Sequence, residues 1–293
     1  MGVFDTIKHR FKQKDILVQL IIINVVVFFI FVIAAMIGKL FKLPSIDLIP
    51  YIGTTSDIHL LIKRPWTVFS YMVAHKDFLH ILMNMLMLFW FGQLFLRYFS
   101  SKNLGSIYLL GGLAGAALYA LTFNTIPYYI DMNHPPMIGA SASVMAIIFA
   151  AAFYKPDAKV SLFMLFRIKV VYIAIFMFII DFISLDSNTN SGGHVAHIGG
   201  AIVGYIFAKQ YLKGKDITRW INKVIDWLVN LTKPSDKKKM KVKYKKREAD
   251  YEFNQRKNQA TEEIDRILDK IKSSGYSSLN TEEKKRLFDA SKK

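Results

Sequence analysis

The sequence predicts an all-α, polytopic membrane protein built as a six-helix bundle. Of its 293 residues, 53% are hydrophobic, and the mean hydropathy of +0.26 is higher than that of an ordinary soluble domain. The apolar residues gather in six blocks, each of about the 18 residues or more that read as a membrane span. One such block could be a buried helix of a soluble protein, but six in one chain favour membrane spans. The blocks cover residues 16–38, 79–97, 104–123, 137–154, 160–184 and 194–212.

The first residues of two blocks indicate whether and where a membrane helix begins. The first follows a basic segment, residues 1–15, yet its apolar stretch of about 22 residues is too long for a cleaved signal peptide, so we interpret it as a retained span. The fifth block contains Arg167 and Lys169, which are costly at membrane depth, and its helix is therefore expected to start near Val170.

Positive charge is distributed unevenly between the loops. The loops at 124–136 and 185–193 contain no Lys or Arg, whereas the N-terminal segment and the loops after the second and fourth blocks are basic. Because basic loops stay in the cytoplasm, both termini of this multi-pass protein are expected there. The long loop at 39–78 departs from the pattern, since it also carries Lys and Arg. The lack of a transit peptide and the basic tail favour the bacterial inner (cell) membrane.

The net charge of +17 is concentrated behind the last block. Residues 209–247 contain 14 Lys or Arg and 3 Asp, which directly after a span favours anionic lipid heads over nucleic acid as the partner. Further on, Thr261 and Thr281 each precede two Glu residues, a helix-start pattern, and Gly275 separates the two helices. We therefore expect four parts: a basic segment at 1–15, a six-helix domain at 16–212, a juxtamembrane linker at 213–250 and a helical hairpin of open role at 251–293.

Cysteine is absent, which excludes disulfides, thiolate nucleophiles and cysteine-based metal sites. The chain also lacks an H-E-x-x-H pattern, so a metalloprotease of that type is set aside. His194 and His197 are spaced for a shared metal ion, but carboxylate partners are few.

Polar side chains inside apolar blocks are costly in a bilayer and therefore point to function. Ser141 opens the fourth block, where unpaired backbone N–H groups at a helix N-terminus can stabilise an oxyanion. In the second block, His80 and Asn84 share one helix face. Each feature also has a structural interpretation, as a capping serine or as hydrogen bonds between helices.

The sixth block brings a histidine together with a packing motif. His197 lies on the same helix face as Gly200 and Gly204, two small residues that allow a neighbouring helix to approach closely. Asp181, in the fifth block, could pair with a histidine such as His194 or cap a water-filled region, and its role stays open.

The candidate polar residues share one depth. Ser141, His197 and Asn84 lie 14, 12 and 13 residues from the basic end of their blocks, which corresponds to ~21, ~18 and ~20 Å of helix. In a core ~30 Å thick, all three then fall about 10 Å below the outer surface. A serine, a basic histidine and an amide donor at one level are the parts of a hydrolytic site. Such chemistry requires a water-filled cavity open to the outer side.

These motifs, in this order, resemble the rhomboid family of intramembrane proteases. The matching pieces are His80-x-x-x-Asn84, Gly139-Ala140-Ser141-Ala142 and Ala196-His197-x-x-Gly200-x-x-x-Gly204, and the resemblance covers about residues 15–212. It implies a serine-type endopeptidase, without a metal or another cofactor, that cleaves transmembrane protein substrates. By the resemblance, Ser141 is the nucleophile and His197 its general base, a pair that requires no acid. His80, Asn84 and the Ser141 N–H form the oxyanion site. The C-terminal hairpin resembles tails of some bacterial rhomboids.

Three residues of the fourth block qualify this resemblance. Ala142 stands where the family often has Gly, and Met145 stands where it often has an aromatic ring against the histidine. Ser143 is a second serine near the motif, but at two residues from Ser141 it points to a different helix face.

Two other functions are compatible with the same residues. One is a catalytically silent relative that binds transmembrane helices, although the presence of both Ser141 and His197 argues against it. The other is a transporter or proton channel, which would show pH-dependent flux and no proteolysis. Its candidate residues are His80, Asp181, His194 and His197.

Overall fold

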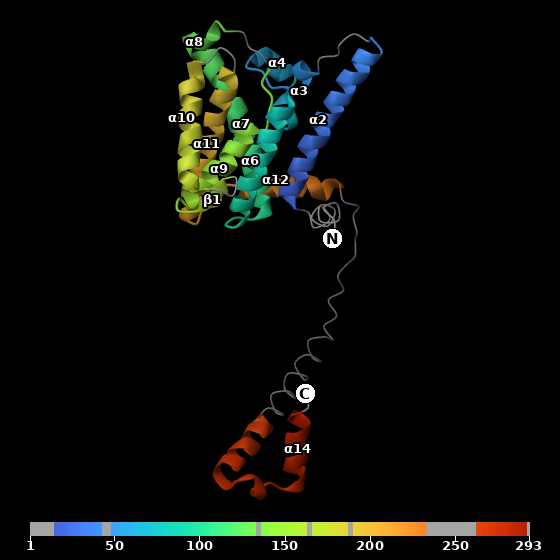
Figure 1. The fold of residues 1–293 in the computed structure, drawn as a ribbon, viewed down its shortest axis with the longest axis vertical. Coiled ribbons are helices and arrows are strands. Elements are labelled where there is room, and N and C mark those ends of the chain that lie inside the picture. The colour runs from blue at the N-terminus through green and yellow to red at the C-terminus, as the bar shows by residue number, and fades with distance from the viewer. Residues whose placement is uncertain are drawn as a thin grey trace. The chain divides into compact units, whose positions relative to one another are not determined.

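The first of two compact units of the chain is a bundle of long helices, as Figure 1 shows. The computed structural model describes residues 15–42, 48–132, 136–162, 166–186, 190–232 and 262–291. Within these ranges, each predicted apolar block contains most or all of one helix of 14 to 25 residues. The helices are α2 (Ile16–Leu40), α6 (Phe78–Leu96), α7 (Ser101–Thr125), α9 (Ser141–Tyr154), α10 (Val170–Ile183) and α11 (Ser191–Leu212).

Three of these helices are long and apolar enough to cross a membrane. The best windows of α2, α6 and α7 have mean hydropathies of 3.2, 1.7 and 1.6, and α9 is a shorter apolar helix. The predicted all-α membrane bundle is confirmed, while the number of six crossings stays a prediction.

Helix α9 lies in the core of the bundle, and its residues from Ala142 to Ala152 are buried. A Cβ atom added to Gly200 of α11 would lie 2.0 Å from the carbonyl oxygen of Ala142, and one added to Gly204 would lie 2.2 Å from that of Ala146. These distances are far below van der Waals contact. Helices α9 and α11 therefore pack backbone against backbone, which glycine alone allows at these two positions.

The segment between α2 and α6 is organised by short helices and holds the approach to α9. They are α3 (Ile49–Ile52), α4 (Ile58–Lys63), α5 (Thr67–Ser70) and the 3₁₀ turn η1 (Tyr71–Val73). Thr54 pairs with Met137 in an isolated β-bridge, and Gly139 N–H donates to the Tyr71 carbonyl oxygen at 2.9 Å. Residues of the predicted long loop at 39–78 therefore hold residues 137–139, which lead into Ser141, by backbone hydrogen bonds.

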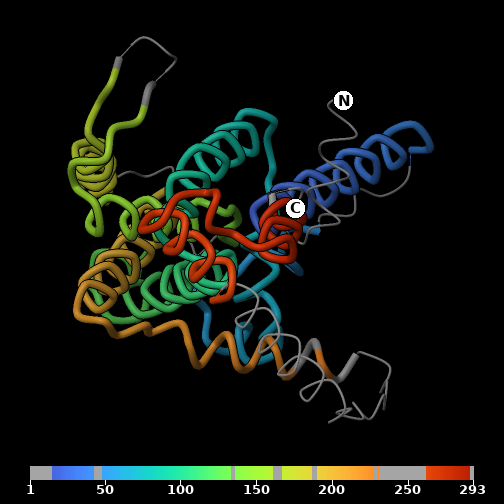
Figure 2. The backbone as a smooth tube through the Cα atoms, turned by 90° about the horizontal axis from the view of Figure 1, so that it is seen from below, coloured from blue at the N-terminus to red at the C-terminus, as the bar shows by residue number. Residues whose placement is uncertain are grey.

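The fifth apolar block requires one correction. Its first residues form an antiparallel hairpin of β1 (Lys159–Leu162) and β2 (Phe166–Lys169), which Figure 2 shows extending away from the helices. Helix α10 begins at Val170, the start that the two basic residues indicated. Lys169 donates to Asp157 at 2.8 Å, and this hydrogen bond holds the pKa of Asp157 below its usual value. The connection between α7 and α9 contains α8 (Pro127–Ile130), and the connection between α10 and α11 contains the 3₁₀ turn η2 (Ser184–Asp186).

The predicted juxtamembrane linker at 213–250 also requires a correction, because part of it is helical. Helix α12 (Arg219–Thr232) crosses one end of the bundle in Figure 1, and residues 233–250 lie outside the described ranges. Asn103 of α7 donates to Asp216 and Thr218 at 3.0 and 2.8 Å, which docks the start of α12. Most of the lysines that indicate a linker lie beyond this helix, whose own basic residues are Arg219 and Lys223.

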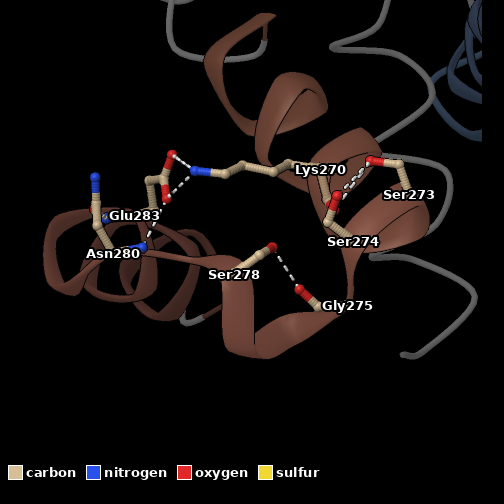
Figure 3. Close-up of polar contacts among 7 residues, drawn as sticks. All are labelled: Lys270, Ser273, Ser274, Gly275, Ser278, Asn280 and Glu283. Carbon is tan, nitrogen blue, oxygen red and sulfur yellow. Dashed lines mark hydrogen bonds and ion pairs between the residues drawn. The ribbon is translucent and has the colours of Figure 1, made fainter.

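The C-terminal residues 262–291 form a separate helical hairpin (Figure 3). Residues 262–274 are helical, Gly275 has a positive φ of 76°, and α14 (Thr281–Ser291) follows the 3₁₀ turn η3 (Tyr276–Ser278). The cap of α14 is Asn280, whose side chain accepts from Glu283 N–H while Glu283 accepts from Asn280 N–H, both at 2.8 Å. Lys270 pairs with Glu283 at 2.9 Å and holds the pKa of Glu283 below its usual value. The residue Thr261 and the rest of the predicted hairpin lie outside the described ranges.

Candidate active site

The structure brings Ser141 and His197 together from two helices that are far apart in the sequence. Ser141 is the first residue of α9, and its Oγ lies 2.6 Å from Nε2 of His197 on α11. The Gly200 and Gly204 contacts hold these helices close enough for this hydrogen bond. A hydroxyl within such reach of an imidazole nitrogen is arranged for proton transfer.

The backbone turn that leads into α9 has a conformation that residues with a side chain rarely adopt. Gly139 has a φ of 129°, which side-chain-bearing residues rarely adopt, and an added Cβ would lie 2.8 Å from Nε2 of His80. Ala140 N–H donates to Nε2 of His75 at 3.4 Å. The turn at Gly139 therefore lets the chain pass His80 and presents Ser141 at the start of the helix.

Asp181 of α10 completes the polar cluster. Its Oδ1 lies 2.7 Å from Nδ1 of His197 and 2.8 Å from Nδ1 of His194, and the residue is only 5% exposed. The sequence left the role of Asp181 open, and the structure pairs it with both histidines. The potential ligand atoms of the three residues lie within 4.8 Å of one another. Two imidazoles and one carboxylate at this spacing are also a set of ligands that a metal ion could use.

A cavity of about 210 Å³ opens beside Ser141 and His197. His80 and Asn84, the residues expected for the oxyanion site, line this cavity together with Gly139. The Asn84 amide donates to the His80 carbonyl oxygen at 2.9 Å, which fixes its position along α6. Tyr71 also lines the cavity and donates to the Gly112 carbonyl oxygen at 2.6 Å. It lies in the segment Arg64–His75, which also resembles the rhomboid family ahead of the second apolar block, but no spacing signal marked Tyr71 itself as a site residue.

Of the three other residues of α9 that the sequence singled out, Ala142 lines the cavity, whereas Ser143 and Met145 lie inside the bundle. Ser143 is 1% exposed and Met145 is 1% exposed, and the cavity lining includes neither. Ser143 is therefore a natural reference for Ser141, because it is the same residue type on the same helix but away from the cavity.

Comparison with known proteins indicates the family that the motifs resemble. Residues 63–214, just over half of the chain, match the Rhomboid domain family, and residues 247–293 match a family of unknown function, DUF6576. The protein named RHOMBOID-like protein 12, mitochondrial, of Arabidopsis thaliana is 31% identical over 162 residues, or 52% of this chain and 48% of that protein. The chain thus spans about half the length of this curated relative.

Fold and site together define an all-α membrane protein that joins a serine and a histidine beside a cavity within its helical bundle. With the domain match over more than half of its length, the chain belongs to the rhomboid family.

Proposed function

We propose that this protein is an intramembrane serine endopeptidase that hydrolyses peptide bonds of transmembrane protein substrates. The observation that carries the proposal is the 2.6 Å hydrogen bond between Ser141 Oγ and His197 Nε2 beside a cavity. A serine hydroxyl is a weak nucleophile by itself and becomes effective when an adjacent base removes its proton. The arrangement therefore favours catalysis over a purely structural hydrogen bond.

The reaction follows from the order of these contacts. His197 Nε2 accepts the hydroxyl proton while Ser141 Oγ attacks the peptide carbonyl carbon, and a tetrahedral intermediate forms. The protonated imidazole then gives its proton to the leaving amine, which leaves an acyl-enzyme on Ser141. A water molecule, deprotonated by the same imidazole, hydrolyses the ester and regenerates the serine.

The negative oxygen of the tetrahedral intermediate needs hydrogen-bond donors. We assign this role to the Ser141 N–H, His80 and Asn84. Ser141 is the first residue of α9, where backbone N–H groups have no partner within the helix, and His80 and Asn84 line the same cavity. The assignment requires no metal ion and no other cofactor.

The direct test is chemical labelling of the folded protein. A fluorophosphonate should modify Ser141 in the detergent-solubilised full chain, because the reagent forms a bond only with an activated serine. Mass spectrometry of the digested protein locates the modification, and prior denaturation should abolish it. Ser143 is an internal control on the same helix and should stay unmodified.

Other results would favour the two alternative functions. A protein that neither reacts with the fluorophosphonate nor cleaves a transmembrane substrate with small residues near its outer end would be a silent relative. Proton flux in liposomes without cleavage would favour the channel. Modification of a serine other than Ser141 would remove the basis of the proposal.

Membrane lipids are the second partner that we propose, with α12 as the contact. Trp220, Val224 and Trp227 lie on one face of this helix and are 60%, 48% and 61% exposed, while Ile221 on another face is 3% exposed. Large apolar side chains beside basic residues are typical of helices at the interface with anionic lipids. We further propose that α12 lies on the cytoplasmic side, at a bacterial inner membrane, because the basic loops gather at that end.

Single cysteines test this contact, because the natural chain has none. A dye on Trp227→Cys should be quenched by lipids brominated in their acyl chains, in liposomes of phosphatidylethanolamine and phosphatidylglycerol. A dye on Asp226→Cys should be quenched much less, since Asp226 faces Lys102 of α7 at 2.8 Å. Equal quenching at both positions would contradict the contact. An impermeant maleimide should reach Lys213→Cys only from the cytoplasmic side.

A further inference from the structure

Asp181 belongs to neither the nucleophile, the base nor the oxyanion site, yet it is the buried charge nearest to them. It is 5% exposed, and the side chains of its two histidine partners are 19% and 20% exposed. Burying a carboxylate in a membrane bundle is costly unless strong hydrogen-bond donors compensate it. Such a residue calls for a functional explanation.

We propose that Asp181 is a positioning residue that holds His197 as the tautomer able to act as a base, so that the site works as a Ser141–His197–Asp181 unit. This inference rests on the proposed proteolytic function. It departs from the expectation that the serine and histidine suffice. The Asp181 carboxylate acts through His197 and does not touch the substrate.

The tautomer argument follows from the atoms in contact. An ionised carboxylate can only accept hydrogen bonds, so Nδ1 of His197, at 2.7 Å from Asp181 Oδ1, carries the proton. In a neutral imidazole the other nitrogen is then an acceptor, and Nε2 is the atom that faces Ser141 Oγ at 2.6 Å. The same contact places a negative charge beside the imidazolium that forms when the serine proton is taken.

His194 explains how the carboxylate itself is held. Its Nδ1 donates to the same Oδ1 at 2.8 Å, from a position one helical turn before His197 on α11. Two charge-assisted hydrogen bonds thus converge on one oxygen and offset part of the cost of its burial. They also connect α10 to α11 directly beside the catalytic base.

A metal ion shared by Asp181, His194 and His197 would be the competing explanation. A metal bound to Nδ1 of His197 would leave the proton on Nε2, and that nitrogen could then not accept the proton of Ser141. Metal binding at this position and base catalysis by His197 therefore exclude each other. The proposal predicts that EDTA leaves proteolysis unchanged, and loss of activity in EDTA would overturn it.

The main experiment compares variants that separate charge from shape. Asp181→Asn keeps the shape and an acceptor oxygen but lets the amide donate a hydrogen bond, which favours the wrong tautomer. We expect kcat for a transmembrane substrate to fall on the order of 10²–10⁴-fold, with KM changed by less than about threefold. Asp186→Asn is the matched control, because this exposed aspartate of η2 bonds to Tyr128 and does not touch His197. A kcat of Asp181→Asn within about threefold of wild type would overturn the proposal.

A second pair of variants keeps the test decisive if Asp181→Asn does not fold. Asp181→Glu and Asp181→Gln have the same size and differ in charge, so a purely structural role predicts equal activities. We expect the Glu variant to be at least about tenfold more active than the Gln variant. Equal activities would overturn the proposal. Failure of the proteolytic function itself would look different, because the wild type would then neither cleave substrate nor react with fluorophosphonate.

Discussion

Replacing Ser141 with alanine should abolish proteolysis while leaving the fold intact. The variant loses the Oγ that lies 2.6 Å from His197 Nε2, and with it the attacking atom. We expect kcat to fall by about 10⁴–10⁶-fold, and any residual rate would come from substrate binding and the oxyanion donors. The measurement is cleavage of a transmembrane substrate by purified protein in detergent or liposomes. The side chain of alanine is nearly as small as that of serine, so unfolding is not expected.

The control for this prediction lies two residues away. Ser143→Ala removes a hydroxyl that is 1% exposed and away from the cavity, and it should retain at least about half of the wild-type kcat. Equal loss of activity in both variants would indicate a packing role for the α9 serines. Full activity of Ser141→Ala would place the nucleophile elsewhere and contradict the proposed function.

The parts of the fold that could be predicted from the sequence are those governed by the bilayer. Long apolar blocks must become helices in lipid because their backbone groups can be satisfied only internally, and Ser141 at a block's beginning is visible without coordinates. The bilayer does not dictate the conformation of the shorter elements, which depends on small differences between local helix and strand preferences. The hairpin at 159–169 carries Lys159, Arg167 and Lys169 within or beside an apolar block, and α12 is a single amphipathic helix between the bundle and a lysine-rich stretch, so neither has the long apolar run of a span.

The candidate site was predictable to the extent that its residues lie in motifs on single helices. Ser141, His197, His80 and Asn84 each have a characteristic neighbour a few residues away. Asp181 has none, since its partners are 13 and 16 residues further along the chain on another helix. Whether α10 turns this carboxylate toward α11 or toward lipid depends on packing that one sequence does not encode in any periodicity.

Substituting Gly200 should have the largest effect on the stability of the bundle. Its missing side chain lets α11 approach α9 so closely that an added Cβ would lie 2.0 Å from the Ala142 carbonyl oxygen. The obstacle is backbone, which cannot rotate away, so the two helices must separate. We expect Gly200→Ala to cost at least the upper end of the range of about 1–3 kcal/mol for overpacking, and Gly200→Leu to prevent folding. Thermal unfolding and size-exclusion profiles in detergent measure both effects.

Position-specific controls distinguish this contact from a general preference for glycine in helices. Gly38 of α2 has nothing within 4 Å of its added Cβ, so Gly38→Leu should leave stability nearly unchanged. Gly204→Ala would also push against backbone, at Ala146, but one turn further from the nucleophile. Because Ala142 directly follows Ser141, Gly200→Ala should lower kcat more than Gly204→Ala does at equal stability. Unchanged stability of Gly200→Ala would mean that α9 and α11 pack less closely than this structure requires, and the geometry of the Ser141–His197 pair would have to be revised with it.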